Sequence, residues 1–172
     1  MIKLFRIDER LIHGQIAIKW SRHTGVDSIV VANDHAAANV MIQKSLKMAA
    51  GIKTVIKSID DAIKTLSDPR CEPLKVLVLV NSPEDALKMA KQVKGIPFIN
   101  VGNYGRVAPK KEGKERKRFD NNLYCDTDEE ATDGDRAGMH LSDYPGRDCN
   151  SVKETDSVKM GVYCNETYYS VR

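Results

Sequence analysis

Short apolar runs alternate with segments of helical spacing over the first hundred residues. Five runs are typical of strands: residues 2–7, 28–32, 52–56, 74–80 and 97–101. Four segments between them have the spacing of amphipathic helices: residues 14–23, 36–50, 59–66 and 83 to about 93. Because strand and helix alternate four times, we predict an α/β domain with an open, mainly parallel sheet and helices on both faces.

Glycine and capping residues mark several helix ends. Gly51 is placed as a C-cap, Ser58 as an N-cap, and Gly95 stops the last helix. The longest helix, over residues 36–50, is strongly amphipathic, and it has a set of mostly apolar residues available to one side: Val40, Met41, Ser45, Met48 and Ala49.

The pattern changes after Gly105. Residues 106–118 are rich in lysine and arginine and are expected to form a solvated loop, and residues 122–125 predict a short strand. From residue 126 the alternation is lost and no apolar run exceeds three residues, so we assign no regular structure there. We therefore divide the chain into an α/β domain over residues 1–125 and an atypical acidic tail over residues 126–172, an incomplete or disordered end of the same domain.

Composition narrows the class of protein. A chain of 172 residues suits one domain, no run is long enough for a membrane span, and no signal peptide is recognisable at the start. The four cysteines are far apart, which favours free cytosolic thiols over a disulfide framework or a zinc site. The net charge of +3 hides an asymmetry: residues 1–125 hold 22 basic and 13 acidic side chains, whereas residues 126–172 hold 5 and 11. Such a basic body favours solubility, and it could also attract an anionic partner.

Ligands of open parallel sheets bind beyond the carboxyl ends of the strands. Four loops lie there in the predicted order: residues 8–13, 33–34, 81–82 and 102–105. The first of them holds a histidine, His13, at the start of a predicted helix, where free N–H groups and the helix dipole bind anions. Arg10 offers a charged fork for phosphate oxygens, Gly14 lets a bulky oxyanion approach the backbone, and a neutral imidazole can attack phosphorus. This arrangement predicts phosphoryl transfer at His13 without a metal; the competing interpretation is a ring that merely hydrogen-bonds the loop.

Several other chemistries lack their signatures. The chain has no GxxxxGK[ST], GxGxxG or HExxH motif and no Cys/His cluster, so we predict no nucleotide cofactor and no metal. We predict no nucleic-acid partner, because the basic stretch lacks interleaved aromatic residues. An aspartyl-phosphate receiver using Asp8 or Asp34 with Mg²⁺ stays open as an alternative, although Arg10 and His13 argue against a magnesium cage.

Three motifs, RIDERLIHGQ at residues 6–15, VVAND at 30–34 and INVGN at 99–103, together with Trp20, carry a resemblance to a known family. Over about residues 1–125 the chain resembles the IIB component of the mannose/fructose/sorbose family of the bacterial sugar phosphotransferase system. The first motif is specific, and the other two reinforce it. The combination looks most like the sorbose and N-acetylgalactosamine branches.

The resemblance implies an open, mainly parallel α/β fold and a role as a phosphocarrier and transferase, a protein-phosphohistidine–sugar phosphotransferase. By resemblance, Nδ1 of His13 accepts a phosphoryl group from the phosphohistidine of a IIA protein or domain and passes it to a sugar carried by the membrane components IIC and IID. The phosphate would be held by three neighbours: Arg10, Gly14 and Gln15. Five residues are expected to border the site: Asp8, Asn33, Asp34, Gly102 and Asn103. The implied location is the cytoplasm, at the membrane permease, and a homodimer is a further possible assembly.

The tail departs from the family. Members continue with a helix, a strand carrying a Gln-x-x-Pro-like segment and a closing helix, none of which is recognisable over residues 131–172. Either the tail has diverged, or the reading frame changes upstream of it; comparing the three translated frames of the DNA decides between them. For function, the alternative to a phosphocarrier of this family is a non-catalytic regulatory or binding module with the same fold.

Overall fold

The computed structural model describes residues 1–107, 113, 115–120, 123–126, 131–132, 138–141, 161–164 and 167–171. Its centre is a parallel sheet in the order β3-β2-β4-β1-β5. The strands are β1 (Ile2–Asp8), β2 (Ser28–Ala32), β3 (Lys53–Lys57), β4 (Val76–Val80) and β5 (Ile99–Asn103). All five strands, and the parallel sheet that they form, were predicted from the apolar runs and are confirmed.

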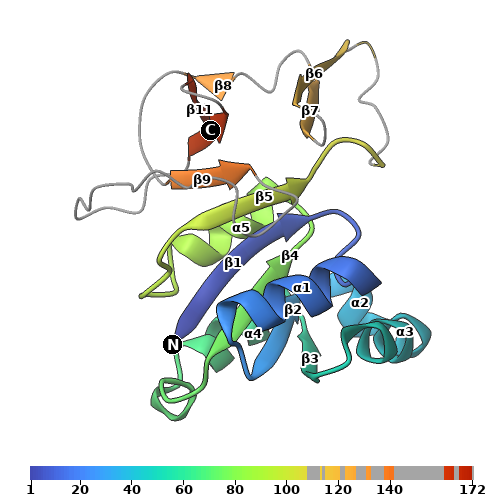
Figure 1. The fold of residues 1–172 in the computed structure, drawn as a ribbon, viewed down its shortest axis with the longest axis vertical. Coiled ribbons are helices and arrows are strands. Elements are labelled where there is room, and N and C mark those ends of the chain that lie inside the picture. Colours follow the sequence, from blue (N-terminus) through green and yellow to red (C-terminus); the bar gives the residue numbers. More distant parts are fainter. Residues whose placement is uncertain are drawn as a thin grey trace.

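Helices cover both faces of this sheet, as the alternation predicted (Figure 1). They are α1 (Gly14–Thr24), α2 (Asp34–Ala38), α3 (Val40–Ala50), α4 (Ile59–Leu66) and α5 (Pro83–Ala90). Successive side chains of a strand point to opposite faces, so neighbours on β1 belong to different cores. Leu4 packs with residues of α1, α2 and α3, whereas Phe5 packs with residues of α4 and α5. Each central strand is therefore buried on both sides.

The helix predicted over residues 36–50 is two helices. Asn39 has an extended backbone, with φ −117° and ψ 108°, and its Oδ1 accepts the N–H groups of Met41 and Ile42 at 3.0 and 3.1 Å. An asparagine that caps the following turn competes with helix continuation, which explains the break. The predicted C-cap is confirmed, because Gly51 has a φ of 66°.

The predicted apolar side of α3 was wrong. Val40, Met41 and Met48 are 63%, 75% and 85% exposed, while Leu46 and Ala50 are the buried residues of this helix. The helix restarts at Asn39. The face that it packs against the sheet carries Leu46 and Ala50, which are one turn apart. The methionines extend into solvent instead.

Beyond β5 the chain forms further strands. A hairpin pairs β6 (Arg116–Asp120) with β7 (Leu123–Asp126), so the short strand predicted near residue 122 is confirmed, whereas the solvated loop predicted through residue 118 ends earlier. The tail contributes β8 (Ala131–Thr132), β9 (Gly138–Leu141), β10 (Gly161–Cys164) and β11 (Thr167–Val171). Strand β9 pairs in parallel with β5 and extends the sheet. In Figure 1, the labels β9, β11 and β8 lie beyond β5.

The carboxyl ends of β1 and β5 lie side by side, and this edge of the sheet carries the candidate site. Asp8 at the end of β1 is in register with Asn103 at the end of β5. The loop after β1 returns along this edge to the start of α1 (Figure 1). In the part of the chain that the structure describes, none of the helices combines the length and hydrophobicity that a membrane-spanning segment needs.

Candidate functional site

The loop between β1 and α1 is held tightly by its own backbone and by two buried side chains. The N–H group of Leu11 donates to the carbonyl of Asp8 at 2.8 Å, which closes a turn. Leu11 has a φ of 55°, an uncommon conformation for a residue with a branched side chain. Its side chain and that of Ile12 are buried, and this packing stabilises the strained turn. The loop thereby presents His13 at a fixed place.

His13 is the N-cap residue of α1 and has an extended backbone. Its imidazole makes no capping bond; instead, Nε2 lies 3.2 Å from Oδ2 of Asp8. The side chain is 25% exposed, so one side of the ring reaches solvent. The first N–H groups of α1 follow directly, and they have no partners within the helix.

The carboxylate of Asp8 is the centre of the polar contacts around His13. It is fully buried, and each of its oxygens accepts two hydrogen bonds. Oδ2 accepts from Nη2 of Arg6 and from His13, both at 3.2 Å. Oδ1 accepts from the backbone N–H of Arg10 at 3.1 Å and from its Nε at 3.4 Å. A buried carboxylate with this set of donors stays in place and ionised.

The environment lowers the pKa of Asp8 below its usual value of 3.8. Burial alone would raise it, since it penalises the charged form, but four lowering effects together outweigh burial: the hydrogen bond from His13, the charges of Arg6 and His13, and the hydrogen bond from the backbone of Arg10. An ionised Asp8 can only accept hydrogen bonds. It follows that Nε2 of His13 carries a proton; in the neutral form of the ring, Nδ1 then has the free lone pair.

This lowered pKa predicts an acid-sensitive stability. The folded-state pKa of Asp8 is below the unfolded value, so its stabilisation is present above pH 3.8 and is lost as the pH falls through the folded-state pKa. We expect the free energy of unfolding, measured in urea at stepwise pH, to fall less below pH 4 for Asp8→Asn than for the wild type. At pH 7 the variant should be less stable by about 3 kcal/mol, because Arg6 stays buried without its ionic partner. Parallel curves for the two proteins below pH 4 would contradict this prediction.

The residues expected to hold phosphate lie around the start of α1. The Arg10 side chain is 44% exposed and reaches the solvent side of Asp8. Gly14 is exposed, and a Cβ added to it would meet no atom within 4 Å, so the helix start is open to a bulky anion. Gln15 is the second residue of α1, and its side chain is not among those that the structure describes.

Glu9 joins this loop to the segment after β5, a role that the sequence did not reveal. Its carboxylate accepts the backbone N–H groups of Gly105, Arg106 and Val107 at 2.7, 3.1 and 2.9 Å. Nδ2 of Asn103 donates to the same carboxylate at 3.3 Å. The 103–107 segment is therefore fixed against the His13 loop, and Gly102 and Asn103 are brought to the site as expected from their place at the strand ends.

The structure gives Asn33 and Asp34 local roles. They follow β2, which is separated from β1 by β4. Oδ1 of Asn33 accepts the N–H of Ala36 at 2.8 Å and caps α2, and Oδ1 of Asp34 accepts the N–H of Ile59 at 2.9 Å at the start of α4. Their described side-chain bonds hold the starts of α2 and α4 rather than the His13 loop.

The cap at Asn33 gives a second prediction. Asn33→Ala should lower the free energy of unfolding by about 1 kcal/mol, because a buried N–H of α2 loses its acceptor. Urea denaturation measures it, with Ser45→Ala on the exposed side of α3 as the matched control, expected to change stability by less than about 0.5 kcal/mol. Equal effects of the two substitutions would refute the cap.

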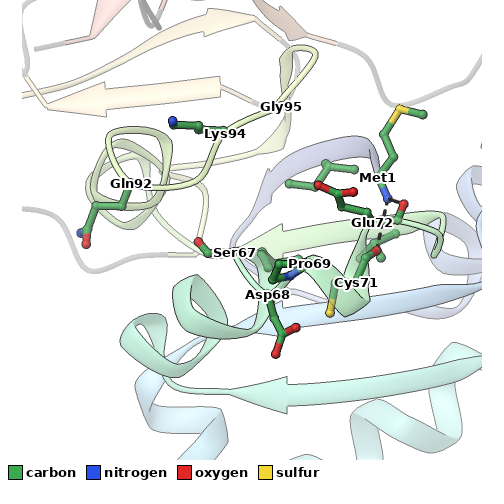
Figure 2. A pocket seen from close by; sticks show the side chains of 12 residues that line it. Met1, Ser67, Asp68, Pro69, Cys71, Glu72, Gln92, Lys94 and Gly95 are labelled. Carbon is green, nitrogen blue, oxygen red and sulfur yellow. Dashed lines mark hydrogen bonds between the residues drawn. The ribbon is translucent and has the colours of Figure 1, made fainter.

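A pocket of about 710 Å³ lies at the other end of the sheet (Figure 2). It is lined by Met1, Val76 and residues of the 66–72 and 92–95 segments, at the amino ends of β1 and β4. The amino group of Met1 donates to the carbonyls of Glu72 and Leu74 beside it. Since ligands of such sheets bind at the carboxyl ends, the pocket lies away from the candidate chemistry. Among the residues that the structure describes, no group of three or more His, Cys, Asp or Glu side chains is arranged to hold a metal.

Comparisons with known proteins identify the family of the chain. The family model described as "PTS system sorbose subfamily IIB component" matches residues 2–129. A probable phosphotransferase enzyme IIB component of Streptococcus pyogenes is 44% identical over 108 residues, 62% of this chain and 66% of the relative. The mannose-specific EIIAB component of Escherichia coli is 32% identical over 104 residues, 59% of this chain and 32% of the relative. The chain thus spans just under two thirds of the first relative and about a third of the second.

A solved structure shares the fold. The N-acetylgalactosamine-specific IIB component 1 of Escherichia coli superposes with a TM-score of 0.69 at 22% identity, over 89% of this chain and 100% of that one. At this identity the likeness concerns the fold alone, and it is the α/β fold predicted from the alternating pattern. The family match, which covers most of the chain, carries the assignment: the chain belongs to the sorbose subfamily of IIB components of the phosphotransferase system.

Proposed function

We propose that His13 carries a phosphoryl group between a phosphohistidine donor and a sugar. The donor would be a IIA protein or domain, and the sugar would be carried by membrane components of the IIC and IID kind. The sorbose-subfamily match supports this role, and the EIIAB relative, whose name joins A and B components, supports IIA as the donor. The observation that carries the proposal is the 3.2 Å contact between Nε2 of His13 and the buried carboxylate of Asp8.

This contact favours Nδ1 as the nitrogen that reacts. With its proton on Nε2 directed at Asp8, the ring offers the Nδ1 lone pair to phosphorus. The Nδ1–P bond forms as the N–P bond of the donor breaks, and the electron pair of that bond leaves on the donor nitrogen. The ring then carries a positive charge. The Asp8 carboxylate stabilises this charge, as a carboxylate stabilises the imidazolium of a catalytic triad.

The neighbours of His13 fit a transferring phosphoryl group. Phosphoryl transfer needs positioning and charge stabilisation more than covalent chemistry. The guanidinium of Arg10 and the N–H groups of Gly14 and Gln15 at the start of α1 would hold the equatorial oxygens. In the second transfer the sugar hydroxyl attacks phosphorus, the Nδ1–P bond breaks, and a base of the membrane partner takes the hydroxyl proton.

The burial of Asp8 disfavours the aspartyl-phosphate alternative. Its side chain is 0% exposed and is enclosed by Arg6, Arg10 and His13, so a phosphoryl donor has no path to it. Asp34 is exposed, but its carboxylate is engaged at the start of α4. His13 is a better acceptor than either.

The test is incubation with phosphoenolpyruvate, the general phosphotransferase components and a cognate IIA, followed by mass mapping of the modified residue. A phosphoryl group on His13, stable to base and labile to acid, is the expected result. Modification elsewhere, or a product cleaved by hydroxylamine as an acyl phosphate is, would overturn the proposal.

A further inference from the structure

Arg6 is a charged side chain inside the central strand of the sheet, and it is fully buried. Nη2 donates to Oδ2 of Asp8 at 3.2 Å, and Nη1 donates to Oδ1 of Asn100 on β5. The guanidinium also lies over the indole of Trp20 on α1, with Cζ 5.3 Å from the ring centroid. Three elements thus enclose one cation, which is costly to bury unless it is paired.

The space for Arg6 is provided by a glycine. A Cβ added to Gly102 would lie 1.7 Å from Nη2 and 2.0 Å from Cζ of Arg6. Strand β5 therefore approaches β1 in a way that only a residue without a side chain allows. The guanidinium lies against the backbone of Gly102 and is directed toward the carboxyl end of β1, where Asp8 lies.

We propose that Arg6 is a positioning residue for the phosphoryl transfer at His13: its fixed charge holds the Asp8 carboxylate ionised and oriented, and so keeps the ring of His13 neutral with its proton on Nε2. This inference rests on the proposed function. Arg6 and His13 bind the same oxygen, Oδ2, from two directions. The positive charge that Asp8 needs is thereby supplied by an arginine, which does not lose its proton, and not by the imidazole.

Arg10 cannot replace Arg6 in this role. Its side chain is 44% exposed, and its Nε contacts the other oxygen, Oδ1, at 3.4 Å. Water screens such a pair, whereas the Arg6–Asp8 pair is 0% exposed on both sides. The interior charge balance of Asp8 therefore depends on Arg6.

Removing this charge should change the protonation of the site. A buried carboxylate without Arg6 would be compensated best by a proton on His13, and a protonated imidazole has no lone pair for phosphorus. Two other titratable groups face the same surroundings from neighbouring positions. Glu9 is bonded to N–H groups of the 105–107 segment, and His23 of α1 contacts the edge of the Trp20 ring, with the centroids 6.3 Å apart.

The experiment measures the initial rate of His13 phosphorylation by phosphorylated IIA against pH, for the wild type, Arg6→Met and Arg6→Lys. In Arg6→Met we expect the acid limb of the profile to move up by about one pH unit, with much of the rate recovered at high pH. Arg6→Lys, which keeps the charge, should restore the wild-type limb. A rate lowered equally at all pH values in Arg6→Met, with the limb unmoved, would show a merely structural arginine and overturn the proposal.

A double variant keeps the test decisive if Arg6→Met does not fold. Arg6→Met combined with Asp8→Asn removes both buried charges, a replacement that proteins tolerate better than the loss of one partner. Since Arg6 acts through Asp8, the double variant and Asp8→Asn should have the same pH profile, and different profiles would overturn the proposal. Failure of the proposed function looks different, because wild-type His13 would then not be labelled at any pH.

Discussion

Replacing His13 by alanine should reduce phosphoryl transfer from IIA by about a thousandfold or more, to the background of the assay. The only atom proposed to bond to phosphorus is Nδ1 of this ring, and removing a nucleophile leaves the binding groups without a reacting partner. The measurement is the initial rate of phosphorylation by phosphorylated IIA, read by intact mass.

The control for this prediction is His35→Ala. His35 is an exposed residue of α2, and it is not among the described hydrogen-bond partners of Asp8. It should keep a rate within about twofold of the wild type. Both variants should also unfold near the wild-type midpoint, because His13 is partly exposed and Asp8 keeps Arg6 when the ring is removed. A His13→Ala protein that is labelled at the wild-type rate would refute the assignment.

The same variant separates a phosphocarrier from a regulatory module. In a reconstituted system with the membrane components, a phosphocarrier without its histidine cannot support sugar phosphorylation. A module that only regulates the permease would leave sugar phosphorylation intact when His13 is replaced. Labelling of His13 together with sugar phosphorylation that persists in His13→Ala would point to regulation.

The sheet could be predicted because its strands are buried on both faces. Runs such as residues 28–32 and 76–80 are apolar at every or nearly every position, and this pattern has few other interpretations. The helix break at Asn39 was missed because an asparagine inside an amphipathic pattern has two possible roles. It can continue a helix, or it can cap the next one. The exposed face of α3 was missed for the same reason, since its register is set by that break.

The site was only partly accessible to sequence reasoning. His13, Arg10 and Gly14 lie within one loop, so their proximity follows from the chain itself. The role of Arg6 could have been suspected, because a charge between Phe5 and Ile7 in a buried strand needs a buried partner. The part that Gly102 plays in making space for Arg6 could not have been predicted, because this contact depends on the alignment of two strands that are far apart in sequence.

The tail remains the part that sequence patterns describe least. The family match ends at residue 129, close to where the hydrophobic pattern is lost. We propose that the reading frame changes there. His-Leu-Ser-Asp-Tyr-Pro, at residues 140–145, is compatible with codons that, read one nucleotide later, spell Thr-Tyr-Gln-Thr-Ile-Pro, a segment of the Gln-x-x-Pro type. Translation of the DNA in its other two frames decides this, and the absence of such an ending in both would exclude it.

Gly102→Ala should be the most destabilising single methyl group that can be added to this site. Its Cβ would lie 1.7 Å from Nη2 of Arg6, far closer than atoms without a bond approach each other, and Arg6 has no exposed direction in which to move. Either β5 shifts away from β1, or the guanidinium leaves Asp8 and Asn100. We expect the free energy of unfolding to fall by about 3 kcal/mol, at the upper end of the usual range for overpacking, and the Tm by about 8 °C.

Gly14→Ala is the matched control, because the same methyl group there meets no atom within 4 Å. Neither glycine has the positive φ that would make alanine strained in itself, so backbone strain does not contribute to a difference in stability between the two variants. Urea and thermal unfolding of the two proteins measure it. If Gly102→Ala were as stable as Gly14→Ala, the guanidinium of Arg6 could not occupy the position described here, and the electrostatic support of Asp8, and through it of His13, would need another source.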